Sequence, residues 1–64
     1  MEQYRITVTT PDEAHRANVD GTHAPAEFAV ADFTAESRHA AERKFSRMRR
    51  EHPEWYQPQL IDVI

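Results

Sequence analysis

Four histidines are the side chains of this 64-residue chain that could most readily hold a metal ion. A pair of ligands on one face of a helix would have to be three or four positions apart, and no two of these histidines are. The chain has no cysteine, so it offers neither a thiolate ligand nor a thiol nucleophile. We therefore expect no metal and no other cofactor, with the histidines in exposed or helix-capping positions. They are His15, His23, His39 and His52.

Patterns that carry catalysis are also missing. The chain has one glycine, which cannot build a loop that wraps a phosphate, and it has no serine in a nucleophile-elbow motif. Its acidic residues are scattered, and so short a chain has little volume for a typical substrate pocket of ~300–1,000 Å³. The sequence therefore predicts that this protein is not an enzyme.

A row of arginines is the best sequence evidence for nucleic-acid binding. Arg43, Arg47 and Arg50 share one face of a helix, with Lys44 beside them, and residues 35–51 carry six basic against three acidic side chains, a net +3. The whole chain, however, carries −3, which repels a polyanion at long range. Basic and acidic residues four positions apart on this helix are also typical of an ordinary solvated surface. Phosphate binding by these four residues is therefore the alternative hypothesis.

The first half of the chain is acidic. Residues 1–34 hold two arginines against six acids (net −4), whereas residues 35–64 hold six basic against five acidic residues (net +1). A charged surface mostly accelerates association with a partner of opposite charge. We expect these carboxylates to attract a basic partner surface: Asp12, Glu13, Asp20, Glu27 and Asp32.

Periodicity predicts three strands and one main helix. Residues 4–9 alternate apolar and polar side chains, residues 27–35 form a second apolar strand, and residues 59–64 form a β-branched third strand. Ser37 is the expected N-cap of a helix over residues 38–51, which Pro53 ends. For residues 10–25 we expect a mobile connection that contains at most a short helix, from Pro11 through Ala17, and the alternative is a long hairpin whose tip is Asp20-Gly21.

These elements predict an α+β fold in the order β–β–α–β. A right-handed crossover makes strands two and three parallel, and placing strand one between them gives a mainly antiparallel sheet in the order 2-1-3. One helix covers one face, using the apolar stripe Ala41, Phe45 and Met48. No secretory signal and no membrane-spanning apolar run is visible, so we expect a single cytoplasmic domain over residues 1–64, without membrane contact.

The chain has more apolar side chains than one helix can cover. Strict alternation puts Phe28 and Val30 on the strand face opposite Phe33, and Tyr56 lies in a segment bracketed by prolines. Exposed apolar patches and Tyr side chains often mark protein contacts, so we expect these residues to meet a partner protein or a second copy of the chain. A β-bulge that turns them inward, or cover by residues 10–25, is the alternative.

The stretch from Phe28 to Ala41, a strand ending in Ala35-Glu36-Ser37 followed by an Ala-rich helix, resembles small phage-encoded inhibitors of the anti-CRISPR type. The resemblance is one of layout and covers about residues 27–64. It implies a non-catalytic, stoichiometric inhibitor of a host nucleic-acid-processing complex, whose basic groove the carboxylates would enter. The Arg-rich helix departs from that pattern. A nucleic-acid-binding protein and a dimeric structural subunit are the alternatives.

Overall fold

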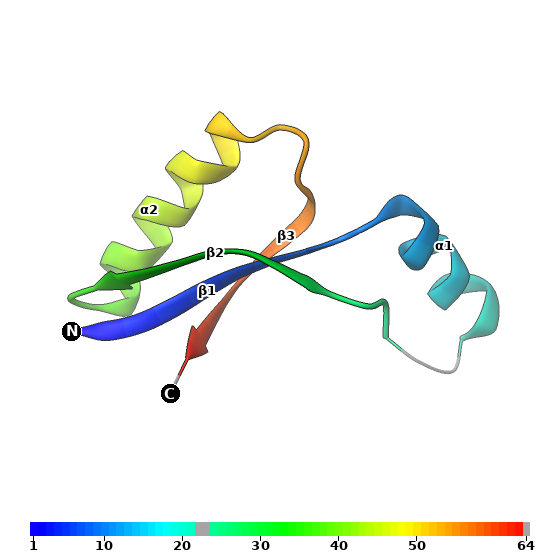
Figure 1. Cartoon of the computed structure of the whole chain (residues 1–64), viewed down its shortest axis with the longest axis horizontal. Helices are drawn as coiled ribbons and strands as arrows, with labels where there is room; N and C mark the ends of the chain where they lie inside the picture. Colours follow the sequence, from blue (N-terminus) through cyan, green and yellow to red (C-terminus); the bar gives the residue numbers. More distant parts are fainter. Residues whose placement is uncertain (22–23, 64) are drawn as a thin grey trace.

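The computed structural model describes residues 1–21 and 24–63, and these build a three-stranded sheet with two helices (Figure 1). The elements follow in the order β1 (Glu2–Thr9), α1 (Pro11–Asp20), β2 (Phe28–Ala35), α2 (Arg38–Glu51) and β3 (Tyr56–Val63). β1 lies at the centre of the sheet and pairs antiparallel with both neighbours, in the order β2-β1-β3. The α+β class and the strand order are confirmed, whereas the prediction of a single helix is wrong because α1 is a second one.

Local capping explains why α1 forms. The Thr10 side chain accepts a hydrogen bond from the Glu13 backbone N–H at 3.1 Å, and Pro11 occupies the first helical turn, where a missing N–H costs nothing. The helix ends at Gly21, whose φ of 68° is left-handed and whose N–H bonds to the Ala17 carbonyl. The hairpin interpretation of residues 10–25 is therefore wrong, and the helix runs three residues past Ala17. Residues 22–23 lie outside the described part of that segment.

The second helix has the predicted bounds. Ser37 Oγ accepts from the Ala40 N–H at 3.2 Å, and the His52 N–H closes the last turn on the carbonyls of Met48 and Arg49. Trp55 stacks on the His52 ring with centroids 4.4 Å apart, so the half-buried indole covers this helix end.

The core is small and lies where α2 meets one end of the sheet. Tyr4, Ala35 and Ala41 are buried there, and Phe33 and Leu60 pack against them. Of the predicted apolar stripe on α2, only Ala41 is fully buried, while Phe45 and Met48 are half-buried. The helix therefore anchors on the sheet through its first turns.

A β-bulge in β2 shows that the predicted sheet face of Phe28 is wrong. Ile6 pairs with Ala31 and Thr7 pairs with Ala29, so Val30 is the extra residue in β2. The alternation resumes one residue late, and Phe28 lies opposite Val8, on the same sheet face as Phe33 rather than on the opposite face. Phe28 is nevertheless 49% exposed, because the core contacts of α2 lie at the other end of the sheet.

The molecule is thin and elongated for its size. It measures 39 × 26 × 15 Å with a radius of gyration of 13.0 Å, against about 11 Å for a compact chain of this length. Its accessible surface is 4776 Å², against about 4,250 Å² expected for a folded protein of 7.5 kDa. The start of α2 lies at one end of the sheet, and helix α1 extends beyond the other end (Figure 1). Neither helix covers the sheet face that carries Arg5 and Thr7.

Candidate functional site

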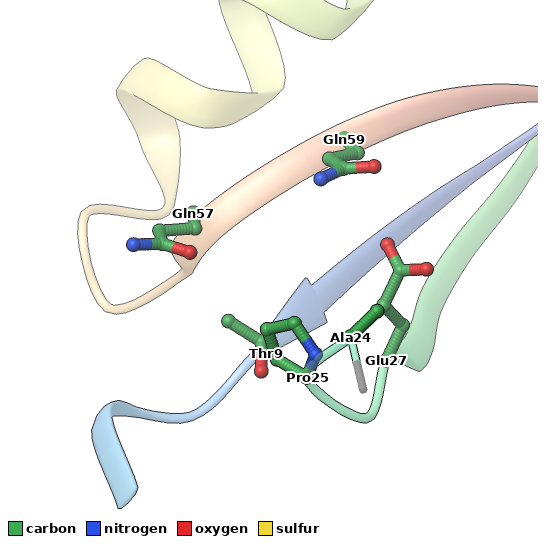
Figure 2. A pocket seen from close by; sticks show the side chains of 6 residues that line it. All are labelled: Thr9, Ala24, Pro25, Glu27, Gln57 and Gln59. Carbon is green, nitrogen blue, oxygen red and sulfur yellow. The ribbon is translucent and has the colours of Figure 1, made fainter. Parts of the chain in front are cut away.

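A pocket lies at the α1 end of the sheet, on the face opposite α2 (Figure 2). Its volume is about 220 Å³. Three segments build it: the last residue of β1, the segment that leads into β2, and the first half of β3. Its lining residues are Thr9, Ala24, Pro25, Glu27, Gln57 and Gln59. We call these six residues the β1-end pocket.

Four of the six side chains that line the β1-end pocket are polar. Thr7 Oγ1 donates to Glu27 Oε1 at 3.1 Å, which holds the carboxylate in place and leaves its second oxygen available. Thr9 is only 6% exposed, and its buried hydroxyl has no hydrogen-bond partner among the described residues. Gln57 and Gln59 add two carboxamides from β3. The described lining of the pocket thus offers several hydrogen-bond acceptors, beside the NH2 donors of the two carboxamides, and its one ionisable side chain is the carboxylate of Glu27.

An unusual backbone conformation shapes β3 at this pocket. Gln57 has a φ of 48°, in the left-handed region that costs a residue with a Cβ roughly 1–2 kcal/mol. The pairing with β1 shifts at the same place, since Thr7 pairs with Gln59 but Thr9 pairs with Tyr56. Residues held in such conformations are concentrated at binding and catalytic sites. This irregularity fixes how the two glutamines enter the pocket.

Two exposed aromatic residues are next in the chain to residues of the β1-end pocket, although Phe28 lies on the other face of the sheet, the one that α2 covers. Phe28 directly follows Glu27 and lies opposite Val8, and Tyr56 directly precedes Gln57 and lies opposite Thr9. Their side chains are 49% and 37% exposed. Each belongs to an edge strand beside the end of β1, which puts their backbones about 10 Å apart. We call the pocket together with Phe28 and Tyr56 the β1-end site.

The structure brings three of the predicted partner-binding residues to this site: Glu27, Phe28 and Tyr56. Sequence reasoning missed Thr9, Pro25 and the two glutamines. Gln57 and Gln59 are two positions apart in a strand, which is the spacing that could have indicated a shared face. The remaining predicted residues, Val30 at the bulge and four carboxylates, lie elsewhere.

Those four carboxylates do not form one acidic surface. Asp12, Glu13 and Asp20 belong to α1, where Glu13 pairs with Arg16 at 3.3 Å. Asp32 lies in the middle of the open sheet face, where the Arg5 guanidinium contacts it at 2.8 Å. That hydrogen bond and the positive charge lower the pKa of Asp32, and they raise the pKa of Arg5. These four carboxylates therefore do not form a continuous acidic surface that could mimic a nucleic-acid backbone.

Five of the basic residues of α2 fall into two groups. Arg38 donates to Asp62 at 2.6 Å rather than to Glu42, and Lys44 donates to the Thr34 carbonyl at 3.0 Å with its ammonium over the Phe33 ring. Lys44 therefore has a structural role. Arg43, Arg47 and Arg50 are exposed and make no hydrogen bond or ion pair within residues 1–21 and 24–63.

Metal-binding and membrane-spanning features are not found in the described ranges. No group of three or more His, Asp or Glu side chains there could hold a metal ion, although His23 lies outside those ranges. No helix of the described chain is both long enough and apolar enough to cross a bilayer. No protein-family model matches the chain, and neither the curated proteins nor the solved structures contain a match.

Proposed function

We propose that this protein is a non-catalytic protein-binding module that uses the β1-end site to occupy a surface of another protein. The observation that carries the proposal is a polar pocket whose neighbours in the two edge strands are exposed aromatic residues: Phe28, which follows Glu27 and lies on the α2 face, and Tyr56, which precedes Gln57. Aromatic anchors beside a few directed polar groups are the usual composition of a binding hot spot. The surrounding strands hold these groups on rigid backbone, which lowers the entropy cost of binding.

The excess surface of the molecule supports this proposal. The protein exposes about 500 Å² more than a typical chain of its mass, and part of that excess is apolar. Val30 and Ile61 on the edge strands are 40% and 38% exposed. Contact with a partner would cover surface of this kind and would supply the burial that a 15 Å thick molecule lacks.

The size of the pocket also favours protein binding over small-molecule chemistry. A volume of about 220 Å³ is below the ~300–1,000 Å³ of typical ligand pockets. It is sufficient for one side chain that a partner inserts. The β1-end site therefore fits recognition of a surface better than turnover of a substrate.

The finer proposal is that the module is a stoichiometric inhibitor of a host nucleic-acid-processing complex, as small phage-encoded proteins are. The acidic first half of the chain supports a basic target, because the net −4 of residues 1–34 lies mostly on α1 and around the β1-end site. Opposite charges around an interface raise the association rate more than the affinity. Affinity would then come from the aromatic anchors.

Site-specific photo-crosslinking tests the proposal. A benzoylphenylalanine at Phe28 or at Tyr56 replaces one exposed aromatic ring with another, and Glu42 on α2 is the matched exposed control position. In cells of the source organism we expect one discrete protein adduct from each of the two site positions and none from Glu42. Equal adducts at all three positions, or no protein adduct at the site positions, would contradict the proposal.

Nucleic-acid binding through α2 is the second candidate function, because Arg43, Arg47 and Arg50 are exposed and unpaired within the described chain. A gel shift on duplex and single-stranded DNA and RNA separates it from the first. Binding that falls steeply with salt and disappears in Arg43→Glu/Arg47→Glu would favour this function. A protein adduct at Phe28 that resists nuclease treatment would favour the first.

A further inference from the structure

We propose that the β1-end pocket receives the guanidinium group of an arginine side chain carried by the partner protein. This inference rests on the proposed function and specifies the chemistry of the partner at the site. Its basis is the carboxylate and the two carboxamides that line the pocket, together with the size and charge of the pocket.

The acceptors of the pocket match an arginine. Glu27 uses one carboxylate oxygen for the Thr7 hydroxyl, so the other remains for a ligand. The carboxamides of Gln57 and Gln59, each with one oxygen that can accept, come from β3 on the other side of the pocket (Figure 2). A guanidinium has five N–H donors in a fixed plane and no acceptor, and it therefore suits a carboxylate surrounded by neutral oxygens.

The apolar wall and the local charge complete the match. Ala24 and Pro25 line the side of the pocket next to Glu27, where they can contact the methylene groups of an arginine. Among the residues that the structure describes, no basic side chain lines the pocket, and Arg5 is already paired with Asp32 at 2.8 Å. The charge of Glu27 is therefore free to attract a cation from outside.

A titration with N-acetyl-L-arginine amide tests the inference. The readout is the NMR shift of the Gln57 and Gln59 side-chain amide signals, at constant ionic strength. We expect saturable shifts of both signals with a millimolar Kd, and no saturable shift with the N-acetyl-L-citrulline amide, which has the same shape without the charge. The lysine analogue should bind at least threefold more weakly, because its ammonium presents fewer donors in a different geometry.

Two variants tie the binding to Glu27. Glu27→Gln keeps a carbonyl that can accept from Thr7 and removes the charge, so we expect at least a fivefold weaker Kd with an unchanged melting temperature. Glu36→Gln removes one exposed charge at the other end of the sheet and should leave the Kd unchanged. Absent shifts, or equal affinities for arginine and citrulline or for the two variants, would overturn the inference.

The outcome separates this inference from the proposed function. A protein adduct at Phe28 combined with no arginine binding would overturn the inference alone. Arginine binding without any protein adduct would instead overturn the proposed function. If the Gln57 and Gln59 signals shift when the protein concentration alone is raised, a second copy of this chain fills the pocket. That result would overturn the inference that the arginine belongs to a different protein.

Discussion

Ile6 and Phe28 show how different two large apolar residues of the same sheet can be. Ile6 in β1 has no exposed surface, whereas Phe28 in β2 is 49% exposed. We expect Ile6→Ala to cost about 2–5 kcal/mol, because it leaves a cavity in a tightly enclosed site. That is a large part of the ~3–10 kcal/mol expected for a chain of this length.

Phe28→Ala is the matched comparison, and we expect it to lower the melting temperature far less while it speeds dissociation of the partner. Urea denaturation of both variants measures the difference. Phe33 and Phe45 are only half-buried, and the loss of stability in Phe33→Ala and Phe45→Ala should fall between those of the other two variants. If Phe28→Ala destabilises the fold as much as Ile6→Ala does, Phe28 is a core residue and not an anchor.

Tyr4 presents a second prediction at the residue scale. Its ring is buried against Phe33, its hydroxyl has no hydrogen-bond partner in the described chain, and burial with the nearby Glu2 and Asp62 carboxylates raises its pKa above 10.0. A raised pKa means that the folded state favours the neutral phenol. Its contribution is complete below pH 10 and is lost as the pH rises through the pKa in the folded state.

We therefore expect Tyr4→Phe to be as stable as the original protein or slightly more stable at pH 7, and clearly more stable above pH 10. Thermal melts from pH 7 to pH 11 provide the measurement, and the difference between the two proteins isolates Tyr4 from the other groups that titrate there. A loss of stability at pH 7 would show that the hydroxyl makes a hydrogen bond, for example to Glu2.

The two helices have the same kind of N-cap but different relations to the core. Thr10 caps α1, which lies beyond the end of the sheet and buries only Ala14 and Ala17, whereas Ser37 caps α2, which contributes Ala41 to the core. Losing such a cap costs about 1 kcal/mol in either helix. The consequences for the rest of the protein should differ.

For Thr10→Ala we expect faster amide exchange confined to α1, with the exchange of β1 and β3 unchanged. For Ser37→Ala we expect faster exchange in both α2 and the strands, because α2 opens together with the core. Hydrogen exchange measured by NMR compares the two variants. Faster exchange of the sheet in Thr10→Ala would show that α1 is part of the cooperative core.

At the scale of the whole molecule, the charge is divided between two ends. Helix α1 carries three acids and one arginine, and α2 carries six basic residues and two glutamates. With a basic partner, neutralising Asp12→Asn/Glu13→Gln should lower the association rate severalfold at low salt, and the effect should vanish at high salt.

The double variant Glu36→Gln/Glu42→Gln is the control. It removes the same amount of negative charge near α2 and should not slow association. Stopped-flow or surface-binding kinetics at two ionic strengths give the rates. A slower rate in both double variants would indicate that only net charge matters, and an unchanged rate in the α1 variant would indicate that α1 faces away from the partner. The melting temperatures of both variants check that α1 still forms.

The sheet edges bear on whether the chain forms a dimer. β2 is interrupted by the bulge at Val30, and β3 contains Pro58, which has no N–H, next to the left-handed Gln57. Both features hinder pairing with a strand of another molecule. We therefore expect light scattering to give the mass of a single chain, 7.5 kDa, across a concentration series. A mass of two chains would favour the dimeric structural subunit.

The sequence alone determined the elements that depend on local chemistry. Ser37, Pro53 and the alternation of residues 4–9 predicted α2 and β1, and the handedness of crossovers predicted the order β2-β1-β3. The pattern Thr10-Pro11-Asp12-Glu13 already contained the start of α1. Its end at Gly21 could not be predicted, because a glycine after Asp20 suits a hairpin turn and a helix terminus equally well.

The tertiary structure alone decided what meets at the β1-end site. The bulge at Val30 reverses the facing of Phe28, and a bulge depends on how two strands settle their register rather than on either sequence by itself. Thr9, Glu27 and Gln57 come from three separate segments, and only the pairing of β1 with both neighbours brings them together. The unpartnered Thr9 hydroxyl follows from that assembly, since burial is a property of the folded surroundings and not of the residue type.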